Sequence, residues 1–155
     1  MNIQKITNME GSKMKKKSNE IIMSIKPKFV YEMYIGNKLY EFRKQFPNVD
    51  TVIIYESFPV QRITGYFKVG EVIKDKPVEL WNSYHHVGGI SKSEFFKYYE
   101  GKKQGIAIQI HKLYKFIEPI DPREISVGFS SPQSYCYNTL FTIGLHESYK
   151  VRRLK

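Results

Sequence analysis

Residues 36–43 have the sequence GNKLYEFR, which is the most informative stretch of the chain. Gly36 suits the end of a helix, and the alternating residues after it predict a strand over residues 38–43 that leaves a tight turn. Glu41 and Arg43 differ by two positions, so they share one face of a regular strand. Lys38 lies at the start of the same strand. The stretch therefore brings two cations and one carboxylate close together.

The segments on either side of this stretch predict a chain dominated by strands. A helix that opens at Pro27 precedes it. Gly65 and Gly70 fall inside a long strand pattern, where they suit bulges or barrel corners. The expected strands cover residues 20–25, 38–43, 51–56, 61–73 and 104–116, and residues 137–145 form a last short strand or helix after a loop at residues 131–135.

An insertion of helices interrupts the strands. One helix opens at Pro77, and the Ser-x-x-Glu pattern at Ser91 is a capping box that starts another. The connections are too short for a set of parallel crossovers. The sequence therefore predicts an α+β fold, a mostly antiparallel β-barrel with peripheral helices.

Length and charge indicate one domain between two basic ends. A chain of 155 residues suits a single core. The formal net charge is +10, of which residues 1–19 and residues 150–155 contribute +4 each. We expect a disordered basic arm over residues 1–19, a domain over residues 20–145 and a basic tail over residues 146–155. Such ends either increase the affinity for phosphates or act only as solubilising tails.

Several classes of protein are disfavoured by the sequence. No apolar run is long enough to cross a membrane, and the N-terminal residues lack the apolar core of a signal peptide. A single cysteine, Cys136, fits a reducing environment. The spacing of the histidines and Cys136 matches no zinc pattern, and no glycine-rich phosphate loop is present. We therefore expect a cytoplasmic protein that uses neither a metal nor a cofactor.

The residues that precede and follow the opening stretch suggest a family. Ser24-Ile25-Lys26-Pro27, followed about ten residues later by GNKLYEFR, resembles the signature of the ASCH family in the PUA-like superfamily. Residues 55–60 and 65–67 are similar to the next two strands of the family, and residues 89–92 and 132–134 resemble its longer prokaryotic and phage members. The resemblance implies a PUA-like barrel with a cleft between the barrel and the first helix. It also implies RNA binding, regulation of transcription or translation, and in some members hydrolysis.

The predicted ligand-binding cleft is centred on four charged residues. Lys26 lies where the first strand meets the helix, at the mouth, and Lys38, Glu41 and Arg43 follow in the next strand. Arginine offers a planar fork, lysine a point charge and glutamate an acceptor for an exocyclic amine. The alternative is an ordinary ion-pair cluster on the surface. Additional polar or stacking candidates are Tyr55, Ser57, Ser134 and Tyr135.

Three functions remain open at this point. The first is an RNA- or nucleobase-binding protein, with a regulatory role in transcription or translation. The second is a hydrolase, either a ribonuclease or a nucleoside amidohydrolase, with Lys38 and Glu41 as its catalytic residues. The resemblance implies a threonine nucleophile three residues after the lysine in ASCH amidohydrolases, and Glu41 replaces it here. The third is an interaction protein whose barrel binds another protein.

Overall fold

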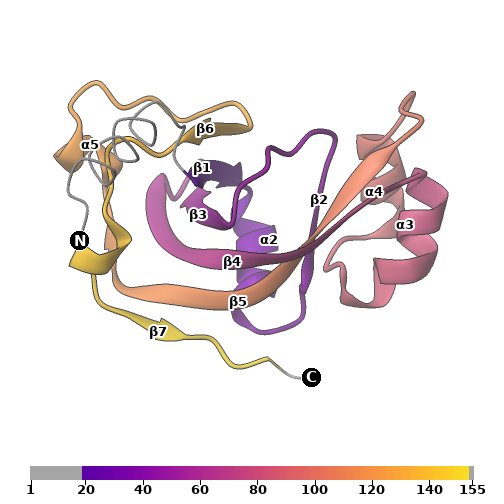
Figure 1. Cartoon of the computed structure of the whole chain (residues 1–155), viewed down its shortest axis with the longest axis horizontal. Coiled ribbons are helices and arrows are strands. Elements are labelled where there is room, and N and C mark those ends of the chain that lie inside the picture. The colour runs from indigo at the N-terminus through magenta and orange to yellow at the C-terminus, as the bar shows by residue number, and fades with distance from the viewer. Residues whose placement is uncertain (1–18, 154–155) are drawn as a thin grey trace, which may run out of the picture.

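The computed structural model describes residues 19–153, which form one curled sheet around a helix (Figure 1). The strand order is β2-β5-β4-β3-β1-β6, and β7 pairs with β5. β1 and β3 are parallel, whereas the other neighbouring strands are antiparallel. The predicted α+β, PUA-like fold is confirmed, with the barrel open as a curled half-barrel. The strands are β1 (Glu20–Ile25), β2 (Tyr40–Arg43), β3 (Thr51–Glu56), β4 (Arg62–Asp75), β5 (Gly105–Ile120), β6 (Tyr135–Tyr137) and β7 (Ser148–Lys150).

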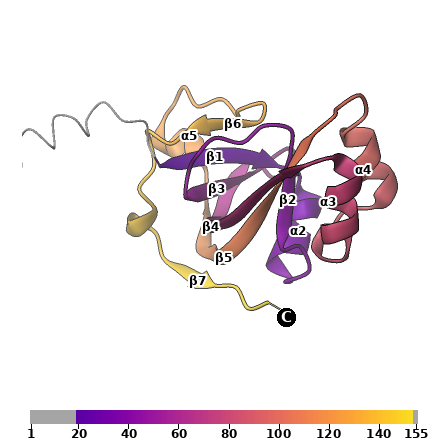
Figure 2. The same cartoon turned by 45° about the vertical axis from the view of Figure 1, so that its right-hand side comes forward.

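Helix α2 (Pro27–Tyr34) lies against the concave side of the curled sheet, as both views show (Figures 1 and 2). Pro27 at the first helical position fits because its missing N–H would have no partner there. Val30 and Met33 are fully buried, in one apolar cluster with residues of β1, β3, β4 and β5. The helix therefore fills the interior of the half-barrel and fixes the position of its own N-terminus beside β1.

The long strand β4 bends where its glycines lie, as predicted. The register between β4 and β5 shifts between Ile63 and Gly65 and again between Val69 and Val72, around Gly70. A Cβ atom on Gly65 would come within 2.3 Å of the Tyr114 carbonyl oxygen and 2.4 Å of the Tyr34 hydroxyl. Glycine is therefore required where α2 and β5 approach this bend.

The inserted helices form a second layer over β2 and β5. They are α3 (Pro77–Tyr84), the short 3-10 helix η1 (His85–Val87) and α4 (Lys92–Tyr98). Phe42 from β2 belongs to one buried apolar cluster with Leu80 of α3 and Phe95 of α4. The Ser91 hydroxyl accepts a hydrogen bond from the Glu94 amide at 3.2 Å, which confirms the predicted cap.

The C-terminal part of the fold differs from the prediction. β6 begins at Tyr135, where the sequence predicted a loop, because it pairs with the edge of β1. After α5 (Pro122–Ile125) and the 3-10 helix η2 (Ile143–Leu145), β7 pairs with β5 and Val151 is buried in the main core. The sheet thus continues beyond the predicted domain end at residue 145. A strand of three residues has too few side chains to be recognised from its own pattern.

Two expectations concern the N-terminus and the membrane. Residues 1–18 of the predicted basic arm lie outside the described residues. Between residues 19 and 153, no helix has the length and apolar character needed to cross a bilayer.

Candidate functional site

Lys38, Glu41 and Arg43 form one buried network at the open side of the half-barrel. The Lys38 ammonium donates a hydrogen bond to the Gly88 carbonyl oxygen at 2.6 Å and lies 3.4 Å from Glu41 Oε1. Arg43 Nε donates to the other carboxylate oxygen at 2.9 Å, and Arg43 Nη2 lies 2.7 Å from the same oxygen as an ion pair. Lys38 is 2% exposed and Glu41 5% exposed, so the alternative of a surface ion-pair cluster is wrong.

Burial and pairing shift the protonation equilibria of this network. Burial lowers the pKa of Lys38, and the Glu41 carboxylate offsets only part of that effect. Burial alone would raise the pKa of Glu41, but the Arg43 and Lys38 cations together outweigh it and hold that pKa below its usual range. Glu41 is therefore a stable anion whose two oxygens are both occupied. Such a carboxylate positions its neighbours and is a poor general base for water.

Arg43 connects β2, which ends the curled sheet on one side, with β1 near its other end. β2 pairs only with β5 in the described strand order, and β1 pairs with β3 and β6, so a gap in the pairing separates β2 from β1. Across that gap, Arg43 Nη2 donates to the Ser24 carbonyl oxygen at 2.8 Å, and Nη1 lies 3.4 Å from the Ser134 hydroxyl. Ser24 is held in turn by the loop before β6, because its hydroxyl donates to the Pro132 carbonyl oxygen at 2.7 Å. The network thus lies at the seam between β2 and β1.

A cavity of about 400 Å³ opens over this seam. Lys26 lies at its mouth as an exposed cation, and Tyr98 of α4 is 36% exposed on one wall. The Lys38 ammonium lies over the rings of Phe29 and Phe42, 5.2 Å from each ring centroid. The other lining residues come from β1, the loop after β3, α4 and residues 131–133. We call this cavity the cleft.

The cleft depends on a close contact between Lys38 and the glycines that follow η1. Gly89 adopts φ +60°, and a Cβ atom there would lie 2.7 Å from Lys38 Cβ. Gly88 places its carbonyl oxygen on the Lys38 ammonium, and the Leu39 amide donates to the Val87 carbonyl oxygen at 2.7 Å. Two consecutive glycines therefore let the inserted segment cover the lysine without a gap.

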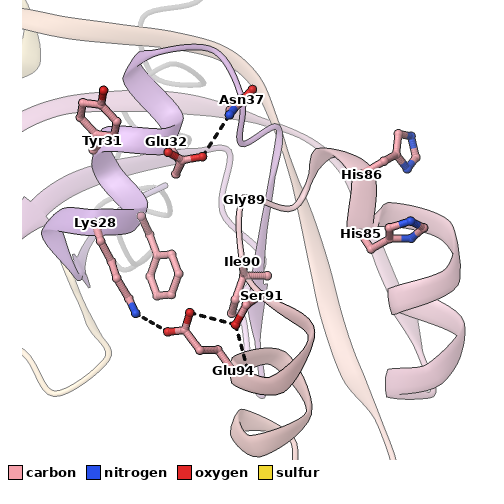
Figure 3. Close-up of a pocket in the computed structure, with 11 residues that line it drawn as sticks. Lys28, Tyr31, Glu32, Asn37, His85, His86, Gly89, Ile90, Ser91 and Glu94 are labelled. Carbon is pink, nitrogen blue, oxygen red and sulfur yellow. Dashed lines mark hydrogen bonds and ion pairs between the residues drawn. The ribbon is translucent and has the colours of Figure 1, made fainter.

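A second hollow of about 690 Å³ adjoins the cleft between α2 and the segment that follows η1 (Figure 3). Lys28 and Glu94 form an ion pair across it, between α2 and α4. His85 and His86 point away from that pair. Phe29, Ile90 and Glu94 lie between this hollow and the cleft, because these three residues line both.

Five of the eight predicted ligand-binding residues line the cleft: Lys26, Lys38, Glu41, Arg43 and Ser57. Ser134 touches its edge through Arg43. Tyr55 does not reach it, because this residue is 4% exposed and packs against Phe129 in a separate apolar cluster. Tyr135 packs against the main core instead, since β6 turns its side chain inward. A stacking role for these two tyrosines is not supported.

Sequence reasoning missed the aromatic walls of the cleft. Phe29 and Tyr98 are separated by nearly half the chain, and each belongs to a helical pattern that is typical of core packing. The Gly88-Gly89 pair was the available indication, because consecutive glycines in a short loop permit a close approach of backbone to another side chain.

The comparisons with known proteins agree with this geometry. A family model described as a domain of unknown function, DUF365, matches residues 28–130. The chain belongs to the DUF365 family. The matched residues of this DUF365 protein include Lys38, Glu41, Arg43 and the inserted helices.

The same DUF365 protein is similar to ASCH proteins. A Zymomonas mobilis protein named ASCH domain-containing ribonuclease is 26% identical over 121 residues, which are 74% of this chain and 81% of that protein. The crystal structure of ASCH from Zymomonas mobilis superimposes with a TM-score of 0.72 at 25% identity, over 77% of this chain and 87% of that chain. The predicted resemblance is confirmed.

A similarity to a larger protein was also found. The large ribosomal subunit protein uL22 of Ureaplasma parvum is 29% identical over 139 residues, which are 87% of this chain. The chain spans 44% of the length of that protein.

Proposed function

We propose that this protein binds single-stranded RNA by inserting one nucleotide into the cleft. The observation that supports this most directly is the buried Lys38–Glu41–Arg43 network, which has two cations for one carboxylate beneath an open cavity. Lys26 adds a further exposed cation at the mouth. A pocket with an excess of positive charge favours a phosphate or the polar edge of a base.

The size and walls of the cleft suit one nucleotide better than a duplex. Its volume of about 400 Å³ lies in the lower part of the range for small-ligand pockets. Phe29 and Tyr98 add aromatic side chains to the walls, and aromatic side chains are the usual partners of an unstacked base. Proteins that recognise RNA sequence act mostly on single-stranded segments, whose bases are free to enter such a pocket. A regulatory role in transcription or translation stays a prediction.

Cleavage of the bound RNA is the second candidate. It is favoured by the similarity to a relative named a ribonuclease, of which this chain covers 81%. In this mechanism the 2′-hydroxyl of the RNA attacks the adjacent phosphorus and loses its proton to water, while the bond from phosphorus to the 5′ oxygen breaks. Lys38 donates a proton to that leaving oxygen, and Lys38 and Arg43 stabilise the charge that develops on the phosphate. A lysine whose pKa is lowered by burial gives up its proton more readily. Glu41 would hold both cations in position.

The binding test uses a variant that leaves the buried network intact. Lys26→Gln removes an exposed cation at the mouth, and Lys92→Gln removes an exposed cation on α4 outside the cleft lining. Fluorescence anisotropy with a labelled single-stranded RNA should give weaker binding for K26Q, with the slope of log K against log salt reduced by about 0.7. K92Q should match the wild type. Equal binding by K26Q and K92Q would refute the cleft as the RNA site.

Turnover is tested on the same RNA. Incubation with purified wild type followed by denaturing electrophoresis detects cleavage. If the protein is a nuclease, Lys38→Met should lose cleavage even at RNA concentrations that saturate a folded sample of the variant. Intact RNA after incubation with the wild type eliminates the nuclease candidate and leaves the binding proposal standing.

A further inference from the structure

A second group of cations lies on the outer face of the sheet, where β4, β5 and β7 run side by side. Lys68 of β4 stands directly opposite Lys112 of β5 in the strand register. Tyr114 of β5 pairs with Lys150 of β7, and the Val151 amide donates a hydrogen bond to the Leu113 carbonyl oxygen. The same register brings Arg152 opposite Lys112. Three cations are thus aligned across three neighbouring strands.

This alignment is unfavourable for the folded protein alone. Like charges directly opposite one another on neighbouring strands destabilise a sheet. Among the described residues, Lys68, Lys112 and Arg152 form no ion pair with a carboxylate. Lys68 instead donates to the Thr51 hydroxyl at 2.8 Å. The Thr51 hydroxyl in turn donates to Asp50 Oδ1 at 2.8 Å, so a carboxylate lies near Lys68. In the described part of the chain, no ion pair offsets the charges of Lys112 and Arg152.

A hollow of about 520 Å³ lies along this row. Its described lining contains four cationic side chains and no acidic one; the lining residues are His111, Lys112, Leu113, Lys150, Val151, Arg152 and Arg153. Arg153 is half-buried, and its Nη2 atom is buried without a hydrogen-bond partner among the described residues. An unsatisfied buried donor is costly, which favours a movement of this side chain that brings the guanidinium to an acceptor on a ligand.

We propose that this cationic face, made of Lys68, Lys112, Lys150, Arg152 and Arg153, binds the phosphate backbone of the RNA whose nucleotide occupies the cleft. The choice of RNA as the partner rests on the proposed function. A row of unpaired lysines and arginines recognises phosphates along a strand without reading its bases. β7 and the residues after it contribute to the cationic face, and β6 follows residues 131–133, which line the cleft. These two strands lie at opposite sides of the sheet in both views (Figures 1 and 2).

The positions of the two surfaces imply a division of roles along one strand. The residues that line the hollow beside β7 include none of those that line the cleft. A ligand of one or two nucleotides can therefore occupy the cleft alone. A longer strand reaches the cationic face as well, so the affinity should increase with RNA length.

The test compares two double variants of the full chain that remove equal charge. K112Q/R152Q neutralises the centre of the cationic face. K102Q/K103Q neutralises two exposed lysines in the turn before β5, outside both hollows. For a labelled RNA of about 20 nucleotides, K112Q/R152Q should lower the affinity about tenfold at about 0.1 M salt and reduce the salt slope by about 1.4. K102Q/K103Q should behave as the wild type.

Equal effects of the two double variants, or no effect of either, would overturn the proposal, because only net charge would then matter. Binding to phosphatidylserine vesicles that depends on the face, without binding to RNA, would also overturn it. A 5′-phosphorylated RNA dinucleotide separates this proposal from the proposed function. It should bind wild type and K112Q/R152Q alike and bind K26Q more weakly. If the dinucleotide fails to bind while the long RNA still distinguishes the double variants, the cleft is refuted and the face remains.

Discussion

The cleft and the cationic face both gather lysine and arginine, but the surroundings of these charges differ. In the cleft, Lys38 and Arg43 are held on Glu41 in a buried network. On the cationic face, Lys112 and Arg152 are exposed and form no ion pair among the described residues. Buried charges require a partner in the fold, whereas exposed ones are free for a ligand. Changes in the cleft should therefore affect stability first, and changes on the face should affect binding first.

The largest effect is expected when the buried network loses its carboxylate. Glu41→Gln leaves the Lys38 ammonium buried without a countercharge, and removal of one partner from a buried pair costs about 3–5 kcal/mol. Urea denaturation at neutral pH should show a loss of that order in the free energy of unfolding. Lys28→Gln breaks the exposed Lys28–Glu94 pair and should cost less than about 1 kcal/mol.

A double variant sharpens this prediction. If the unpaired ammonium causes the loss, K38M/E41Q should be more stable than E41Q alone, because the buried charge is then gone as well. Equal losses for E41Q and K28Q would mean that the buried network contributes no more than a surface pair.

The contact between Gly89 and Lys38 gives the next largest effect. Gly89→Ala places a methyl group 2.7 Å from Lys38 Cβ at a backbone φ of +60°. Gly101→Ala has a similar backbone conformation, φ +77°, but meets nothing within 4 Å, so it measures the backbone strain alone. Thermal or urea unfolding should show G89A less stable than G101A by about 1–3 kcal/mol. Equal stabilities would show that the lysine moves aside without cost.

The pH dependence of stability tests the burial of Lys38. Because burial lowers the pKa of Lys38, the unfolded chain binds its proton more tightly than the folded protein does. The free energy of unfolding should therefore rise as the pH increases from the lowered pKa of Lys38 in the folded protein to its pKa of about 10.4 in the unfolded chain. Glu41 adds stability that is present above about pH 4.3 and lost as the pH falls through its lowered pKa.

The measurement is the difference in stability between wild type and K38M from about pH 7 to about pH 9.5. The upper limit avoids the buried tyrosines, because burial raises the pKa of Tyr34 and Tyr99 and reverses the trend above the unfolded tyrosine pKa of about 10. The rise with pH should be smaller in K38M. Parallel curves for the two proteins would contradict a lowered pKa at Lys38.

The sequence predicted those parts of the cleft that depend on local pattern. Spacing by two on one strand placed Glu41 and Arg43 on the same face, and the capping box at Ser91 set the start of α4. Lys26 was predicted at the mouth because it precedes the helix-opening proline. These inferences needed only neighbours in the chain.

The parts that the sequence did not predict depend on distant contacts. Tyr55 alternates as a strand residue should, but nothing local indicates which of the two faces of β3 borders the cleft. The basic end of the chain was expected to be a tail because β7 is short, and its pairing with β5 is set by partners more than thirty residues away. The row of cations on the cationic face is therefore visible only in the register of the sheet.

The smallest effect concerns that row and has the opposite sign. Lys112→Gln removes the central charge between Lys68 and Arg152, so it should stabilise the folded protein by about 0.2–1 kcal/mol while it weakens the binding of long RNA. Lys102→Gln, in an exposed turn, should change neither quantity. Urea denaturation at low salt measures the gain, which should decrease in high salt because exposed charges are screened. A loss of stability in K112Q would mean that Lys112 packs favourably with its neighbours. The stability of the fold would then account for the row of cations without a ligand.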